Sequence, residues 1–126
     1  MGGRLLRAVC GLVFFLAMGL GAQAGQPYDE KAFNEAQAAG KPVLINVTAP
    51  WCPTCRQQKP IIGAIEKERP SLVVFDVDFD SSKNLLRKLR VRSQSTLIVF
   101  KGEKEVGRST AETSPDRLRA LVAKGF

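Results

Sequence analysis

The sequence predicts a single α/β domain built on a four-stranded mixed sheet with helices on both faces. Apolar runs with the character of buried strands occur at 43–48, 72–77 and 96–100. Stretches with helical spacing of apolar residues lie between these runs, and alternating strands and helices are typical of a sheet covered on both faces. The chain has 126 residues, 44% of them hydrophobic, which suits one domain and leaves no room for two.

Residues 1–24 have the pattern of a secretory signal peptide. Two arginines precede an almost entirely apolar stretch over 9–20, and Ala22-Gln23-Ala24 offers a small-x-small cleavage site. The apolar stretch is short for a membrane span of about 20 residues. An uncleaved anchor is the alternative. We therefore expect a folded domain over 25–126 that is periplasmic or secreted after cleavage.

The first half of the domain is predicted as helix, strand, helix. The first helix begins near Asp29, a residue type that caps helices, and ends at Gly40. The run 43–48 is nearly unbroken in its apolar character, which indicates a strand buried on both faces, as in a parallel sheet. A helix over 56–69 follows, with the charged run 66–69 as its solvated end.

The second half is predicted as strand, helix, strand, strand, helix. The strand at 72–77 leads to a helix that starts after Ser81-Ser82. A right-handed crossover would make the first two strands parallel. The strands at 96–100 and 105–109 are joined by a short turn, so they must be antiparallel. Ser114-Pro115-Asp116 combines a cap, a proline at the first position and an acid in the first turn, and predicts the last helix.

Cys52 and Cys55 are the only cysteines outside the predicted signal peptide, and they lie where the first strong strand passes into a helix. A thiol at a helix N-terminus is favoured as the thiolate, the form that attacks disulfides. A bridge between them would close only two intervening residues and would stabilise the fold little. The pair therefore favours thiol–disulfide exchange, with a purely structural disulfide as the alternative.

The composition limits other chemistry. The chain contains no histidine, which excludes histidine as a general base, haem ligand or zinc ligand. We expect no cofactor and no metal site held by one chain. An alternative is a module that binds Cu(I), or a cluster shared between two chains, through its two thiolates.

The charge balance gives a second alternative. The net charge is +7, and one helix face carries Arg87, Lys88 and Arg90, with Arg92 just after it. Such a face could serve a non-catalytic binding domain that meets acidic partners, although a solvated helix face accounts for the same charges. We do not expect nucleic acid as a partner.

The order of elements, with Trp51-Cys52-Pro53-Thr54-Cys55 after the first strong strand, resembles the thioredoxin family. The resemblance covers nearly all of 28–124. Ala49-Pro50 looks like the family's approach to the active site, Pro60 matches the proline that kinks the helix of the active site, and Val91-Arg92 with 96–102 resembles its third-strand signature. It implies a thioredoxin-like fold, here lacking the usual first strand because little chain precedes the first helix.

The resemblance also implies a role for each cysteine. Cys52 would attack a substrate disulfide and form a mixed disulfide, and Cys55 would resolve it. The two residues would form a redox-active disulfide. Substrate contacts are expected from Trp51, Pro53 and Ser95.

Three departures from the family pattern matter. Ser95 stands where the family has a cis-proline, and we expect a trans bond there, since a non-proline cis bond costs about 2.5–4 kcal/mol. Asn46 replaces the family's buried aspartate, and Asp76 stands where an accompanying lysine often lies. We hypothesise that Asp76 takes over proton transfer near Cys55. The alternative is that Asp76 faces solvent at a strand end.

These observations predict an exported thiol–disulfide oxidoreductase that acts on cysteine pairs of secreted proteins. Pro53-Thr54 carries no charge and no histidine, which favours a reductant. The expected partners are protein disulfides or dithiols, together with a membrane-bound electron donor that recharges the protein. We expect a monomer.

Overall fold

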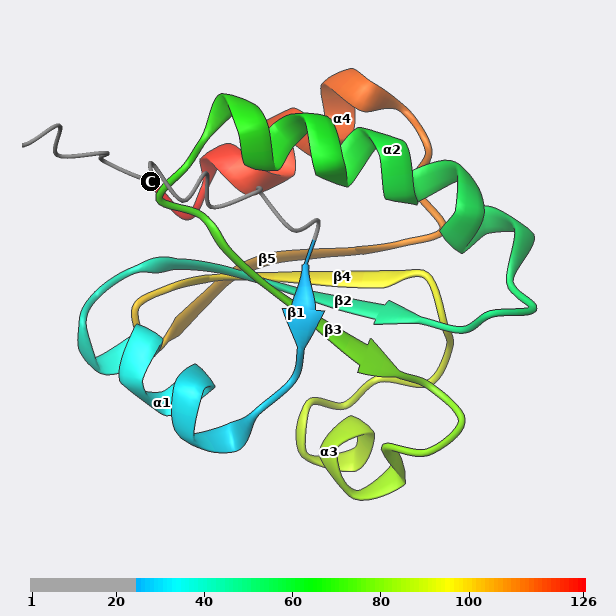
Figure 1. Cartoon of the computed structure of the whole chain (residues 1–126), viewed down its shortest axis with the longest axis horizontal. Coiled ribbons are helices and arrows are strands. Elements are labelled where there is room, and N and C mark those ends of the chain that lie inside the picture. Colours follow the sequence, from blue (N-terminus) through cyan, green and yellow to red (C-terminus); the bar gives the residue numbers. More distant parts are fainter. Residues whose placement is uncertain (1–24) are drawn as a thin grey trace, which may run out of the picture.

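The computed structural model describes residues 25–126, and the predicted signal peptide lies outside the described residues. These residues form a five-stranded sheet with two helices on each face (Figure 1). The strands are β1 (Gln26–Pro27), β2 (Pro42–Thr48), β3 (Val73–Asp78), β4 (Thr96–Lys101) and β5 (Lys104–Thr110). The helices are α1 (Glu30–Ala38), α2 (Pro53–Glu68), α3 (Lys83–Lys88) and α4 (Pro115–Ala123).

The strand order is β1-β3-β2-β4-β5, and the sheet is mixed. β2 pairs with β3 in parallel, and β4 is antiparallel to both β2 and β5. These directions confirm the prediction from connection lengths. The predicted α/β fold class is therefore confirmed.

The sheet has five strands, where the sequence predicted four. Gln26 and Pro27 pair in parallel with Phe75 and Asp76 at the edge of β3, and form the two-residue strand β1. A proline lacks the N–H that a central strand needs, but an edge strand tolerates it. This short strand fixes the position of the chain just after the predicted cleavage site.

The core has two layers, one on each face of the sheet. One layer is covered by α1 and α3, and the other by α2 and α4 (Figure 1). Val43, Ile45 and Val47 of β2 face the first layer, whereas Leu44 faces the second, and all four are fully buried. The prediction that this strand is buried on both faces is confirmed.

The alternation of side chains along β2 and β3 determines which of their residues point toward α2. Neighbouring residues of a strand point to opposite faces. Because Leu44 and Val74 face α2 and α4, Asn46 and Asp76 point to the same side, and the register pairs these two residues directly. The sheet therefore presents an amide and a carboxylate beneath the helix that carries the cysteines.

The starts predicted for α1 and α4 are confirmed, whereas α2 starts at Pro53, three residues before the predicted start at 56. The Asp29 carboxylate accepts a hydrogen bond from the Ala32 N–H at 2.8 Å, and the Ser114 hydroxyl accepts one from the Arg117 N–H. α3 is short, with only Leu86 fully inside the core.

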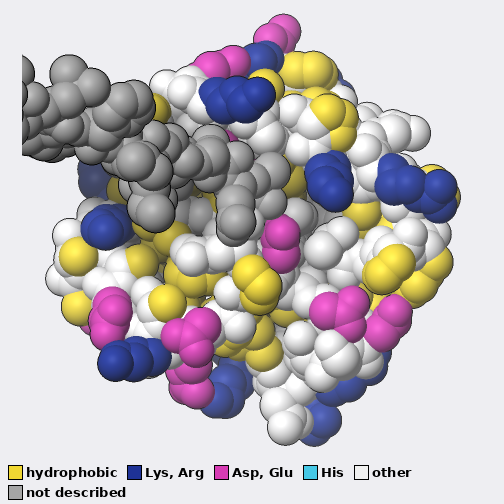
Figure 2. All heavy atoms as spheres, in the orientation of Figure 1, with side chains coloured by type: hydrophobic (Ala, Val, Ile, Leu, Met, Phe, Trp, Pro, Cys, Tyr) yellow, Lys and Arg dark blue, Asp and Glu magenta, His cyan; other side chains and the backbone are white. Residues whose placement is uncertain are grey.

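The surface carries charges of both signs. On the face shown in Figure 2, Lys and Arg side chains are interspersed with Asp and Glu side chains. Arg87 and Lys88 lie in α3, whereas Arg90, predicted on the same helix face, follows the end of the helix together with Arg92. All four side chains are exposed. Within residues 25–126, no helix is long and apolar enough to cross a membrane.

Candidate active site

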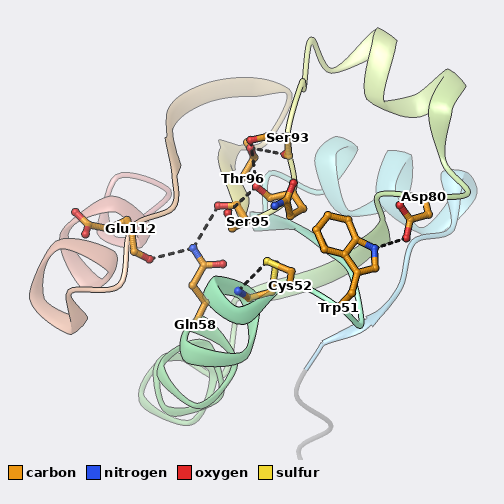
Figure 3. The surroundings of a disulfide bond; sticks show 10 residues. Trp51, Cys52, Gln58, Asp80, Ser93, Ser95, Thr96 and Glu112 are labelled. Carbon is orange, nitrogen blue, oxygen red and sulfur yellow. Dashed lines mark hydrogen bonds between the residues drawn. A yellow bond between two sulfur atoms is a disulfide. The ribbon is translucent and has the colours of Figure 1, made fainter.

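Cys52 is the N-cap residue of α2. The loop after β2 delivers it there in an extended conformation, and Pro53 occupies the first helical turn, where its missing N–H costs little. The Cys52 Sγ atom accepts a hydrogen bond from the Cys55 N–H at 3.1 Å (Figure 3). That amide is one of the free N–H groups of a helix start, and it would stabilise a Cys52 thiolate.

Cys52 and Cys55 form a disulfide, with their Cα atoms 5.3 Å apart. Cys52 has no exposed surface, and Cys55 is 6% exposed. Both pack with Ala49, against the partly buried Phe79. A reaction partner therefore reaches the Cys52 sulfur only after the side chains that cover it move.

Trp51 and Pro53, two of the expected substrate contacts, lie at the surface beside the disulfide. Trp51 is 51% exposed, although its Nε1–H donates to the Asp80 carboxylate at 2.7 Å and its ring meets Phe79 edge-on (Figure 3). The indole is thus held in place while one side remains open. An exposed, fixed aromatic surface suits contact with a partner protein.

Ser95, the third expected contact, is buried. Its peptide bond to Gln94 is trans, as expected, and its backbone has a positive φ of 57°. The Ser95 N–H donates to the Val47 carbonyl at 2.8 Å, and its hydroxyl donates to the Gln94 carbonyl. These bonds use the N–H and hydroxyl of Ser95 inside the protein, so the loop offers little from this residue to a substrate.

Asp76 lies within β3, half-buried, and not at a strand end. The Asn46 side-chain amide donates to Asp76 Oδ1 at 3.0 Å. Burial raises the pKa of the Asp76 carboxyl, and the Asn46 hydrogen bond and the charge of Lys59 partly offset this increase. Asp76 and Cys55 line the same cavity of about 360 Å³, which is large enough to hold water.

Glu66 lines the same cavity, and the sequence analysis had placed it at the solvated end of its helix. That placement is wrong for Glu66, which is half-buried and accepts a hydrogen bond from the Gly25 N–H at 3.1 Å. Burial raises the pKa of its carboxyl, and the nearby charge of Asp76 raises it further. Its role depends on a contact with Gly25, 41 residues away, and no local pattern indicates such a contact.

Gln58 is a second residue that the sequence analysis missed. It is 1% exposed, and its Nε2 donates to the Ser95 carbonyl at 3.2 Å and to the Glu112 carbonyl at 3.0 Å (Figure 3). The side chain thereby ties the helix of the cysteines to two loops. Gln58 lies three residues after Cys55 and four before Ile62, on the buried stripe of α2. This spacing could have predicted from the sequence that Gln58 is buried.

We expect Gln58→Leu to destabilise the oxidised protein by about 1–3 kcal/mol, because the buried bond to the Ser95 carbonyl and the partly buried bond to the Glu112 carbonyl are both lost. The free energy of unfolding in denaturant measures this loss. The exposed neighbour Gln57 provides the control, since Gln57→Leu should change stability by less than about 0.5 kcal/mol. Equal unfolding midpoints for the two variants would show that the Gln58 amide does not hold the loops.

The metal-binding alternative, through two thiolates or a cluster shared between two chains, stays a prediction. Among residues 25–126, no group of three or more His, Cys, Asp or Glu side chains is placed to hold a metal ion. In this structure the two sulfurs are bonded to each other, and the Cys52 sulfur accepts the Cys55 N–H.

Comparison with known proteins agrees with the fold and the cysteine pair. The family model for thioredoxin matches residues 26–124. A thioredoxin of Chlamydia trachomatis is 36% identical over 99 residues, which cover 79% of this chain and 96% of that protein. The structure is also similar to Trxlp from Edwardsiella tarda, with a TM-score of 0.74 and 43% identity over 76% of this chain and 95% of that one. Fasciola hepatica thioredoxin superposes with a TM-score of 0.67 at 30% identity, covering 77% of this chain and 90% of that one. The chain therefore belongs to the thioredoxin family and is a thiol–disulfide oxidoreductase of the thioredoxin type.

Proposed function

We propose that this oxidoreductase works outside the cytoplasm, after cleavage between Ala24 and Gly25, as a reductant of disulfides in exported proteins. Export rests on the signal-peptide pattern of residues 1–24. The observation that carries the redox reaction is the position of Cys52 at the N-cap of α2, with its sulfur on the Cys55 N–H. This geometry stabilises one thiolate in the reduced protein and makes Cys52 the attacking residue.

The reaction then runs in two exchanges. The Cys52 thiolate attacks one sulfur of the substrate disulfide, the substrate S–S bond breaks, and the other substrate sulfur leaves as a thiolate that takes up a proton. The Cys55 thiol loses its proton, attacks the Cys52 sulfur, and releases the second substrate thiol. Two electrons pass to the substrate, and the protein is left with the Cys52–Cys55 disulfide.

Asp76 is proposed to accept the proton of Cys55. It lies in the cavity that Cys55 also lines, and its raised pKa brings it closer to neutral pH, where a general base is most effective. Asn46 holds the carboxyl in position through its amide. The carboxylate that the family places on one strand is here supplied by the neighbouring strand.

The direction of electron flow follows from how weakly the thiolate is stabilised. Pro53 and Thr54 carry no charge, and the chain contains no histidine. One amide at a helix start is a modest stabilisation of the reduced form, so the disulfide is a weak oxidant. A membrane-bound donor of two electrons must then restore the dithiol, and a monomer is sufficient for each step.

Cys55→Ser is expected to leave substrates covalently attached to Cys52, because the mixed disulfide forms but is not resolved. Mass spectrometry of the complexes, isolated without reducing agent, identifies the partners. Exported proteins that contain cysteine pairs are expected. The same experiment with both cysteines replaced by serine is the control and should retain nothing.

Two outcomes would contradict the proposal. Trapped partners that are all cytoplasmic would remove the assignment to exported substrates. A measured potential near about −120 mV, the value of a strong oxidant, would reverse the direction. Mass determination of the exported chain gives the cleavage site independently of activity.

A further inference from the structure

Gly25 lies against the cavity beside Cys55. Its N–H donates to Glu66 Oε2 at 3.1 Å, and β1 holds the following residues on the edge of β3. A Cβ atom on Gly25 would come within 2.5 Å of Asp76 Oδ2 and 2.8 Å of Oδ1. The Asp76 carboxylate therefore packs directly on the Gly25 Cα, and only glycine fits there.

The two carboxylates around Gly25 each accept one hydrogen bond from a neutral donor, the Gly25 N–H for Glu66 and the Asn46 amide for Asp76. Glu66 Oε1 is buried and has no hydrogen-bond partner among residues 25–126, whereas Asp76 Oδ1 has the Asn46 amide. Burial raises the pKa of both carboxyls. The other charged groups that line the cavity are Arg56 and Lys59 from α2 and Asp78 from β3. An unpartnered buried carboxylate oxygen is costly, and a positive donor at Gly25 would remove this cost.

We propose that cleavage after Ala24 completes this site: the new α-ammonium of Gly25 pairs with Glu66, lies beside Asp76, and sets the charge of the cavity next to Cys55. The inference rests on the cleavage site proposed above. Hydrolysis of the Ala24–Gly25 bond by a protease consumes one water and leaves a carboxylate on Ala24 and an ammonium on Gly25.

The α-ammonium of Gly25 has more N–H donors than the uncleaved amide, and it carries a positive charge. Before cleavage, the Gly25 nitrogen has one N–H, which Glu66 Oε2 accepts, and no charge. After cleavage it has three N–H groups and a positive charge, so it can also donate to Glu66 Oε1 and to Asp76. A positive charge favours the ionised form of Asp76, so the carboxylate is available as a base at lower pH. Processing would thereby set the pH above which the proton acceptor of the redox site is ionised.

The test compares two chains that differ only at the N-terminus, one starting at Gly25 and one retaining Ala24. Residues 25–126 contain every described strand and helix and both core layers, so each chain carries the whole fold. In the chain that starts at Gly25, NMR titration should give an α-amino pKa at least about one unit above its usual value near 8, a tenfold tighter hold on the proton. The chain that retains Ala24 should give an ordinary value.

The Asp76 carboxyl provides a second readout, followed by carbon NMR. Its pKa should be lower in the chain that starts at Gly25 than in the chain that retains Ala24. Glu66→Gln should remove at least half of the α-amino shift, whereas Glu103→Gln, in the exposed turn after β4, should leave it unchanged.

An ordinary α-amino pKa in the chain that starts at Gly25, or one that Glu66→Gln does not lower, would overturn the inference. So would cleavage of the exported protein at another bond. Neither readout uses the exchange reaction, so a protein that showed the coupling but reduced no disulfide would refute the proposed function alone.

Discussion

Cys52→Ser is expected to abolish disulfide reduction, with a loss on the order of 10³-fold or more, since removing a covalent nucleophile costs up to about 10⁶-fold in other enzymes. The serine hydroxyl stays protonated at neutral pH and does not attack sulfur. Reduction of a protein disulfide, with a small dithiol as the electron source, measures the loss.

The fold should survive this substitution. Serine is a preferred N-cap residue, so its hydroxyl can accept the Cys55 N–H as the sulfur does. The lost bridge spans only two intervening residues and contributes little stability. Thr54→Ser, between the cysteines, is the control and should retain its rate. If Cys52→Ser kept more than a tenth of the rate, a sulfur other than Cys52 would be the attacking one.

The order of elements was predictable because its signals are local. β2 is recognisable from its continuous apolar run, and the starts of α1 and α4 from Asp29 and Ser114, whose side chains cap the adjacent turn. The directions of the strands followed from the lengths of the connections. The two-residue strand β1 has no such signal, because its pairing depends on the free edge of β3.

The candidate site was predictable only in part. The cysteines stand in a motif, and Asp76 was noticed because it interrupts an apolar strand. Glu66 and Gln58 were not predicted because their partners lie in distant parts of the chain. Glu66 contacts Gly25, and Gln58 contacts the loops of Ser95 and Glu112. A polar residue on the buried stripe of a helix is a signal that can be searched for.

The peptide bond of Ser95 could be predicted from the sequence, but its hydrogen bonds could not. The sequence indicated a trans bond in place of the family's cis-proline, and the structure has it. The backbone of Ser95 then turns inward with a positive φ, and its N–H bonds to Val47 of β2. Hydrogen bonds that a loop makes inside the fold depend on the sheet it meets, so the bond from the Ser95 N–H to Val47 was not visible in the sequence.

Asp76→Asn is expected to slow the resolving step by about 10²-fold, the low end for general base catalysis, because an amide does not accept the Cys55 proton. Burial raises the pKa of Asp76, so the rate of the unmodified protein should rise with pH as this carboxyl ionises. The variant should lack this rise and keep only the rise at higher pH that ionisation of the Cys55 thiol gives. Rapid-mixing kinetics of the resolving step, across pH on the chain that starts at Gly25, measure both effects.

Asp76→Asn should lower the rate of the resolving step but raise the free energy of unfolding at neutral pH. A carboxyl whose pKa is raised by folding contributes stability below its unfolded pKa, near 3.8, and that contribution is lost as pH rises through the folded pKa. Asp76→Asn removes the buried charge, so the variant should be more stable than the unmodified protein at neutral pH and should lose this advantage in acid. Glu103→Gln, in the exposed turn after β4, is the control for removing one acid and should leave the resolving rate unchanged. A variant that lost rate and stability together would mean that Asp76 supports the fold beneath α2 and does not accept the proton.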